Sequence, residues 1–224
     1  MVRYMNNILG DITSEYVYIQ PVDERDMSLI GGEITALTAR TGDTDFCVIT
    51  VPVKDWNSDL TPWKAAPVFG SRGFGSGAAD TLKDIEGIVE QFEAKHSGTA
   101  RKYIICGYSL AGLFALWSVY NTDIFEAAVA ASASVWYPGW KEYAAEHEAM
   151  ARAVYLSLGD KEEKTKNKVM STVGDAMRAQ YELLQTQGIR SVLEWNEGNH
   201  FADSNIRVAK GMAWVRNELK HMQI

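Results

Sequence analysis

Apolar and polar positions follow two different patterns in the first 53 residues, and each pattern predicts a different kind of strand. Residues 14–22 (SEYVYIQPV) and 31–40 (GGEITALTAR) alternate apolar and polar side chains. Such alternation is typical of antiparallel strands with one solvated face. Residues 44–53 (TDFCVITVPV) are almost continuously apolar. They predict a strand that is covered on both faces, in a central and largely parallel sheet.

Strand-like and helix-like patterns alternate from residue 78 to the end of the chain. In 78–98, apolar residues recur at helical spacing, and Gly98 follows as a stop signal. The further predicted elements are strand 102–106, helix 110–120, strands 126–132 and 153–159, helix 168–188, strand 190–195 and helix 203–221. This order predicts an α/β fold with a mostly parallel sheet, helices on both faces and antiparallel strands near the N-terminus.

The length of 224 residues, with no linker-like segment, predicts one domain over residues 1–224 without a large lid. Residues 54–77 are rich in Gly, Pro and aromatic side chains and predict a long loop. Loops of this length inside compact domains are often functional. In parallel sheets of this kind, ligands bind at the carboxyl ends of the strands.

Composition and charge exclude several classes of partner. The formal net charge of −7, without a basic stripe, argues against nucleic acid. No stretch approaches the roughly 20 apolar residues of a membrane span, and the N-terminal residues lack the apolar core of a signal peptide. Cys47 and Cys106 lie in strand-like runs, where cysteine is usually buried and free. We therefore expect a soluble protein of the reducing cytoplasm.

The segment KYIICGYSLAGLFALWS (102–118) places a serine between a predicted buried strand and a predicted helix. A serine at the tip of a sharp strand-to-helix turn requires small residues two positions away on either side. Gly107 and Ala111 meet that requirement, although Ala111 adds one methyl group to the usual G-x-S-x-G pattern. Ser109 is therefore the candidate nucleophile, and a turn serine without chemistry is the alternative.

A serine hydroxyl needs a general base, and the base needs an orienting carboxylate. Among the four histidines, His200 follows the last predicted strand, at the sheet edge where Ser109 is expected. The acid is expected after strand 153–159, where Asp160, Glu162 and Glu163 all compete. The order serine, acid, histidine is that of α/β-hydrolases.

Six segments carry a resemblance to a known family: DWNSDLTPW (55–63), FGSGAADTL (74–82), GYSLAG (107–112), SASVWYPGW (132–140), LGDKEE (158–163) and EGNHF (197–201). With these segments the chain resembles the esterase branch of the α/β-hydrolase superfamily that includes esterase D, siderophore esterases and feruloyl esterases. The resemblance spans most of the chain from Asp55 onward.

The resemblance implies a role for further residues. It favours Glu162 as the acid, because the acid in this branch usually stands three residues after the glycine that ends its strand; Asp160 remains the alternative. It also implies an oxyanion hole formed by the backbone N–H of Leu110 and by an N–H near Trp56. Each such donor is worth about 3 kcal/mol of the barrier.

Aromatic residues in the loops suggest a substrate pocket. Trp136 and Tyr137 follow a predicted strand, and together with Trp56 and Trp63 they are candidates for its wall. Packing beneath the long loop is the alternative. The glycines of 70–77 are not followed by a Lys-Ser/Thr pair, which argues against a phosphate cradle.

The sequence therefore predicts a serine esterase that forms an acyl-enzyme on Ser109 and needs neither a cofactor nor a metal. Its expected partner is a small-molecule ester. Two alternatives remain: acyl transfer with the same residues, and a non-catalytic binding protein with the same fold.

Overall fold

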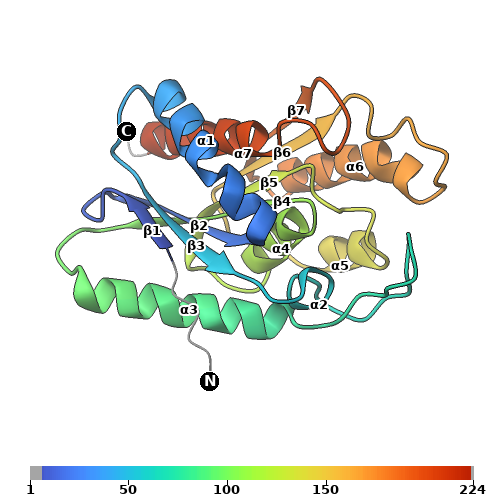
Figure 1. Ribbon diagram of the computed structural model, residues 1–224, viewed down its shortest axis with the longest axis horizontal. Coiled ribbons are helices and arrows are strands. Elements are labelled where there is room, and N and C mark those ends of the chain that lie inside the picture. The colour runs from blue at the N-terminus through green and yellow to red at the C-terminus, as the bar shows by residue number, and fades with distance from the viewer. Residues whose placement is uncertain (1–6, 223–224) are drawn as a thin grey trace.

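A mixed β-sheet forms the centre of the molecule (Figure 1). The structure is a computed structural model and describes residues 7–222. Within these residues, seven strands pair in the order β1-β3-β2-β4-β5-β6-β7. They are β1 (Asn7–Gly10), β2 (Tyr16–Val22), β3 (Cys47–Pro52), β4 (Lys102–Tyr108), β5 (Phe125–Ala131), β6 (Ala153–Gly159) and β7 (Arg190–Asn196). β1 runs antiparallel to β3 and the other neighbouring pairs are parallel, which confirms the predicted mostly parallel sheet.

Helices cover both faces of the sheet, as predicted (Figure 1). They are α1 (Glu24–Thr41), α2 (Trp56–Asp59), α3 (Ala78–Lys95), α4 (Leu110–Val119), α5 (Trp140–Glu146), α6 (Val173–Thr186) and α7 (Ser204–His221). α1 and α7 bury Leu37 and Met212 in the apolar cluster on one face. α3, α4 and α6 contribute Ile85, Leu113 and Met177 to the cluster on the other. Each strand of the centre is therefore packed on two sides.

The prediction of a strand at 31–40 is wrong, because these residues belong to helix α1. The helix begins after Asp23, whose side chain accepts a hydrogen bond from the N–H of Asp26, and ends at Gly42 with φ 74°. Gly and Thr are poor helix formers. Packing against α7 overrides that preference, since Glu33 and Leu37 lie one turn apart on the buried side of α1.

The N-terminal strands also differ from the prediction in their pairing. β2 is a strand as expected, but it runs parallel to β3 and β4 and is buried along its whole length. The hydroxyl of Tyr18 has a partner inside the protein, since it donates to the carbonyl of Met212 at 3.0 Å. The antiparallel strand is instead the four-residue β1, which precedes the predicted segment.

Residues 1–6 and 223–224 lie outside the described residues. The predicted domain covers both of these ranges, and the predicted absence of a signal peptide concerns the first of them. Among residues 7–222, none of the helices is both long and apolar enough to cross a membrane.

Glu33 is a carboxyl group buried between α1 and the sheet, with 3% of its surface exposed. Burial raises its pKa to about 8, although Gln20 donates a hydrogen bond to it. The unfolded chain loses this proton near pH 4.5 and the folded chain only near pH 8, so the folded state loses stability as pH rises through this window.

We therefore expect Glu33→Gln to reduce the loss of stability between pH 5.5 and pH 8. The difference should approach about 1.4 kcal/mol per pH unit, because a one-unit pKa shift corresponds to that free energy. Urea unfolding of both proteins at the two pH values measures it. An identical pH dependence in the two proteins would show that Glu33 does not titrate in this way.

The carboxyl ends of the parallel strands place several loops at one edge of the sheet. β2 leads to Asp23, β4 leads to Ser109, and the loops after β6 and β7 carry Glu162 and His200. The predicted long loop at 54–77 contains the short helix α2 and a bridge between Ala65 and Phe74.

Candidate active site

Ser109 lies at a sharp turn between β4 and α4. Its backbone has φ 59° and ψ −119°, a conformation that costs energy for a residue with a side chain. A Cβ atom on Gly107 would collide with the backbone carbonyl of Ala111. The methyl group of Ala111 is tolerated because Gly107 opposite it has no side chain. The turn therefore needs a glycine at 107 and accepts alanine at 111.

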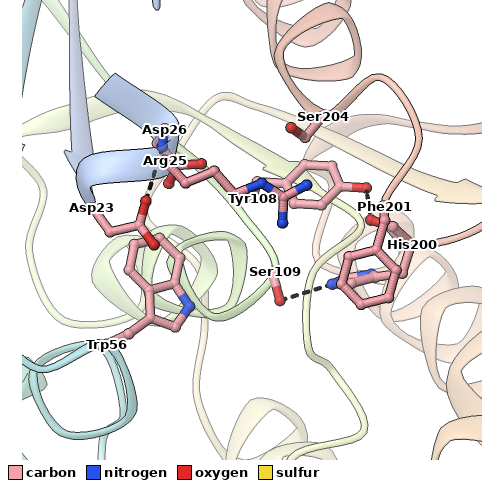
Figure 2. Close-up of a pocket in the computed structure, with 9 residues that line it drawn as sticks. All are labelled: Asp23, Arg25, Asp26, Trp56, Tyr108, Ser109, His200, Phe201 and Ser204. Atoms are coloured by element: carbon pink, nitrogen blue, oxygen red, sulfur yellow. Dashed lines mark hydrogen bonds between the residues drawn. The ribbon is translucent and has the colours of Figure 1, made fainter. Parts of the chain in front are cut away.

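The structure brings the three predicted residue types together, and Figure 2 shows two of them, Ser109 and His200, joined by a hydrogen bond. His200 Nε2 lies 3.0 Å from Ser109 Oγ, and His200 Nδ1 lies 2.7 Å from Glu162 Oε2. The Glu162 side chain is only 3% exposed, whereas that of His200 is 23% exposed. One hydrogen-bonded chain thus connects a buried carboxylate to a serine hydroxyl at the surface of a cavity.

The second oxygen of Glu162 is held by three donors. Oε1 accepts hydrogen bonds from the N–H of Gly159 at 2.7 Å, from Ser132 Oγ at 2.8 Å and from Arg207 at 2.9 Å. Burial by itself would raise the pKa of this carboxyl group, but the hydrogen bonds from His200, Gly159 and Ser132 outweigh it. The pKa of Glu162 therefore lies below its usual value, and the group is a carboxylate at neutral pH.

The competing acids have other partners. Asp160 Oδ1 accepts the N–H of Gly198 at 2.8 Å, so it supports the backbone of the loop that carries His200. Glu163 pairs with Arg178 at 3.3 Å. Both imidazole nitrogens of His200 are already engaged with Ser109 and Glu162, and the geometry favours Glu162 as the partner of His200.

A cavity of about 180 Å³ opens beside Ser109. It is lined by Asp23, Arg25, Asp26, Trp56, Tyr108, Ser109, His200, Phe201 and Ser204 (Figure 2). The sequence pattern predicts no element at residues 23–30, so Asp23, Arg25 and Asp26 are not among the predicted site residues. It also missed Tyr108 and Phe201, although their positions next to Ser109 and His200 were a usable signal.

Charged and aromatic groups meet at the mouth of the cavity. Burial and the neighbouring charge of Asp23 raise the pKa of Asp26 to about 6. The Arg25 guanidinium lies 5.9 Å from the ring centroid of Phe201, a side chain that is 70% exposed. An apolar ring this exposed beside His200 offers contact area to a ligand.

The predicted aromatic wall is only partly present. Trp56 lines the cavity, whereas Trp63, Trp136 and Tyr137 pack around Phe74 and one another. Trp63 donates to the carbonyl of Pro138 at 2.7 Å. These three residues therefore pack with one another and with residues of the loop 54–77, which is the alternative predicted for them, and do not line the cavity.

Three helices begin near the cavity or at Ser109. Leu110 and Trp56 are the first residues of α4 and α2, and first-turn N–H groups have no acceptor within their own helix. In α1, the Asp23 carboxylate takes the N–H of Asp26, so the Arg25 N–H is not used by this cap. Arg25, the second residue of α1, lines the cavity, whereas the first residue, Glu24, does not.

A metal centre is not indicated by the described part of the chain. Across residues 7–222, no three His, Cys, Asp or Glu side chains are close enough together to hold a metal ion.

Comparison with known proteins identifies the fold class of this chain. No protein-family model and no curated protein match the chain in sequence. An IroE-like serine hydrolase from Shewanella oneidensis is similar in structure, with a TM-score of 0.74 and 16% identity over 94% of this chain and 75% of that one. The siderophore hydrolase EstA from Aspergillus nidulans has a TM-score of 0.68 and 21% identity, over 92% of this chain and 83% of that one.

The enterobactin esterase FES from Shigella flexneri is also similar, with a TM-score of 0.67 and 16% identity over 95% of this chain and 55% of that one. The chain therefore has the α/β-hydrolase fold. Within that fold, the similar structures include a serine hydrolase, a siderophore hydrolase and an enterobactin esterase, so the predicted resemblance to the esterase branch is confirmed at the level of the fold.

Proposed function

We propose that the protein is a serine esterase that cleaves a small-molecule ester through an acyl-enzyme on Ser109. The observation that carries the proposal is the hydrogen-bonded chain from Glu162 through His200 to Ser109, which ends at the wall of a cavity. The esterase names of the similar structures support the same reaction class.

In the acylation step, Ser109 Oγ attacks the ester carbonyl carbon and its proton passes to His200 Nε2. The tetrahedral intermediate collapses as His200 returns that proton to the leaving alcohol. Water then attacks the acyl carbon by the same route, and Ser109 Oγ takes back a proton as the acid leaves. Glu162 accepts the Nδ1–H of His200 throughout, which keeps Nε2 free to receive a proton.

We assign the oxyanion donors to the N–H groups of Leu110 and Arg25. The second donor of an α/β-hydrolase comes from a strand-to-helix connection beside the nucleophile. β2 pairs directly with β4, and β2 leads into Arg25, whereas the strand before Trp56 lies one position further away. The family resemblance implies Trp56, in the connection after β3, whereas the direct pairing of β2 with β4 supports Arg25.

Arg25→Pro should lower kcat about 100- to 1,000-fold, the usual cost of losing one oxyanion donor. Proline is tolerated in the first turn of a helix but has no N–H. Arg25→Ala keeps the N–H and should retain most of kcat, and Glu24→Pro tests the effect of proline on α1 itself. Steady-state hydrolysis of p-nitrophenyl acetate measures all three. A larger loss in Trp56→Pro, relative to Trp56→Ala, would return the assignment to Trp56.

The cavity limits the size of the enclosed substrate part. Its volume of about 180 Å³ is below the roughly 300 to 1,000 Å³ of pockets that enclose drug-sized ligands. We propose that the acyl group or a small alcohol is enclosed and that the remainder of the ester lies against the exposed ring of Phe201.

A screen of an ester library on the purified protein, with Ser109→Ala as the control, tests this function. Hydrolysis of at least one ester that depends on Ser109 is the expected result. Added alcohols or sugars as competing acceptors would reveal acyl transfer by a different product. A non-catalytic binding protein would show neither turnover nor labelling of Ser109 by a fluorophosphonate.

A further inference from the structure

Arg207 lies buried beneath the candidate active site, in the first turn of α7, with 1% of its side chain exposed. One guanidinium nitrogen, NH1, is within hydrogen-bond distance of Glu162 Oε1 at 2.9 Å, Ser132 Oγ at 3.0 Å and the Tyr108 hydroxyl at 3.0 Å. The other, NH2, donates to the carbonyls of Glu197 and Asn199 at 3.1 and 3.0 Å. A single side chain thus contacts segments that follow or end four different strands.

We propose that Arg207 is a positioning residue for the esterase reaction proposed above, on which this inference rests. It fixes the Glu162 carboxylate, the loop that carries His200 and the residue that precedes Ser109 in one relative geometry. Without Arg207, the hydrogen-bonded chain from Glu162 through His200 to Ser109 would lose the side chain that contacts all of these segments.

The contacts require the shape of a guanidinium. Its two terminal nitrogens point in fixed directions, so one can serve Glu162 while the other serves two backbone carbonyls. Because Oε1 of Glu162 is held in this way, Oε2 is left for His200 Nδ1. A lysine at this position keeps the charge but cannot occupy both places.

Tyr108 provides a second connection between Arg207 and His200. Its hydroxyl lies 3.0 Å from Arg207 and donates to the backbone carbonyl of His200 at 2.8 Å, and its ring centroid lies 5.3 Å from that of His200 (Figure 2). Burial raises the pKa of Tyr108 to about 12, so the hydroxyl remains a donor at working pH. The imidazole is therefore oriented from its backbone side as well as from Glu162.

Arg207 also acts on Glu162 through its charge. The groups that face this carboxylate are Arg207, His200, Ser132 and the N–H of Gly159, while Tyr108 faces Arg207. A cation at 2.9 Å favours the ionised carboxylate. Loss of that cation should let Glu162 take up a proton at a higher pH.

α7 offers a matched control in Arg216. Its side chain is 2% exposed and is paired with Asp43 at 2.7 Å and Asp45 at 3.4 Å. It is thus similarly buried and also paired with carboxylates, in the same helix, but its partners lie in the loop before β3 rather than in the candidate site. A general effect of disturbing a buried arginine should appear at both positions.

The experiment compares Arg207→Lys and Arg207→Met with Arg216→Lys and Arg216→Met. Circular dichroism and urea unfolding give the folded fraction, and kcat, KM and the pH profile are measured with p-nitrophenyl acetate. Arg207→Lys should lower kcat about 100-fold with little change in KM, the scale of a 1 Å misplacement of reacting groups. Arg207→Met should lower kcat further and move the acid limb of the profile to higher pH. The Arg216 variants should keep kcat per folded molecule.

Tyr108→Phe decides the question if the Arg207 variants do not fold. It removes only the hydroxyl that joins Arg207 to the His200 carbonyl and should lower kcat about 10-fold with KM unchanged. Folded Arg207 variants with normal kcat and pH profile would overturn the proposal, as would an equal loss in the Arg216 variants. If the Arg207 variants do not fold, normal kcat in Tyr108→Phe overturns it. A wild-type protein that neither hydrolyses esters nor reacts with a fluorophosphonate would overturn the proposed function itself.

Discussion

Ser109→Ala is expected to lower the hydrolysis of p-nitrophenyl acetate by at least about 10⁴-fold, because the substitution removes the attacking oxygen and leaves only binding and oxyanion stabilisation. The serine hydroxyl makes its hydrogen bond to His200 at the edge of a cavity, and its loss should change the free energy of unfolding by about 1 kcal/mol or less. The measurement is kcat/KM of the two proteins, together with urea unfolding of each.

Ser118→Ala is a suitable control for this comparison. Ser118 lies in the helix that follows Ser109, and its hydroxyl donates to the carbonyl of Phe114 at 2.8 Å. Its removal should leave kcat/KM within about twofold. Unchanged turnover in Ser109→Ala would end the assignment of the nucleophile, and an equal loss in both variants would point to damage to α4.

The residues of the hydrogen-bonded chain could be predicted because each follows a strand. Ser109 comes directly after β4, Glu162 and His200 lie in the loops that follow β6 and β7, and parallel strands bring their carboxyl ends to one edge. The identity of the acid needed more than this order. Asp160 and Glu162 both follow β6, but the N–H of Gly159, Ser132 and Arg207 hold Glu162 towards the imidazole, whereas Asp160 accepts the N–H of Gly198.

The wall formed by α1 could not be predicted from local patterns. The segment 31–40 combines weak helix formers with an alternation that also fits a strand, and its helical form depends on packing against α7 far along the chain. The sequence pattern predicts no helix at residues 24–30, so the connection at Asp23 to Asp26 is not predicted as part of the site. The choice of Trp56 as second oxyanion donor comes instead from the family resemblance, which implies the connection after the strand at 44–53; we propose Arg25 in its place because β2 pairs directly with β4.

Arg207 shows a further limit of reading a sequence. It contacts a carboxylate 45 residues away and a tyrosine 99 residues away, and within its own helix it occupies an ordinary buried position. Without the coordinates, an arginine in an amphipathic helix is most simply a solvated residue. The polar contacts of Arg207 join residues that are far apart in the chain, so they produce no regular spacing in the sequence.

The two candidate acids should separate by kcat. Glu162→Gln is expected to lower kcat by a factor that approaches about 10⁴, as when the orienting acid of a serine protease is replaced by its amide. Three donors surround Oε1, so a glutamine should place its carbonyl oxygen there and turn its NH₂ group towards His200 Nδ1. The imidazole would then carry its proton on Nε2, where it cannot accept the proton of Ser109.

Asp160→Asn should have a far smaller effect, of about tenfold or less in kcat. The asparagine oxygen can still accept the N–H of Gly198, so the loop that carries His200 keeps its support. Both variants exchange a carboxylate for an amide of the same size, and kcat at pH 7 with matched folded fractions gives the comparison. A greater loss in Asp160→Asn would make Asp160 the orienting acid. In that case the loop after β6 must rearrange during turnover, since Glu162 holds the imidazole in the resting geometry.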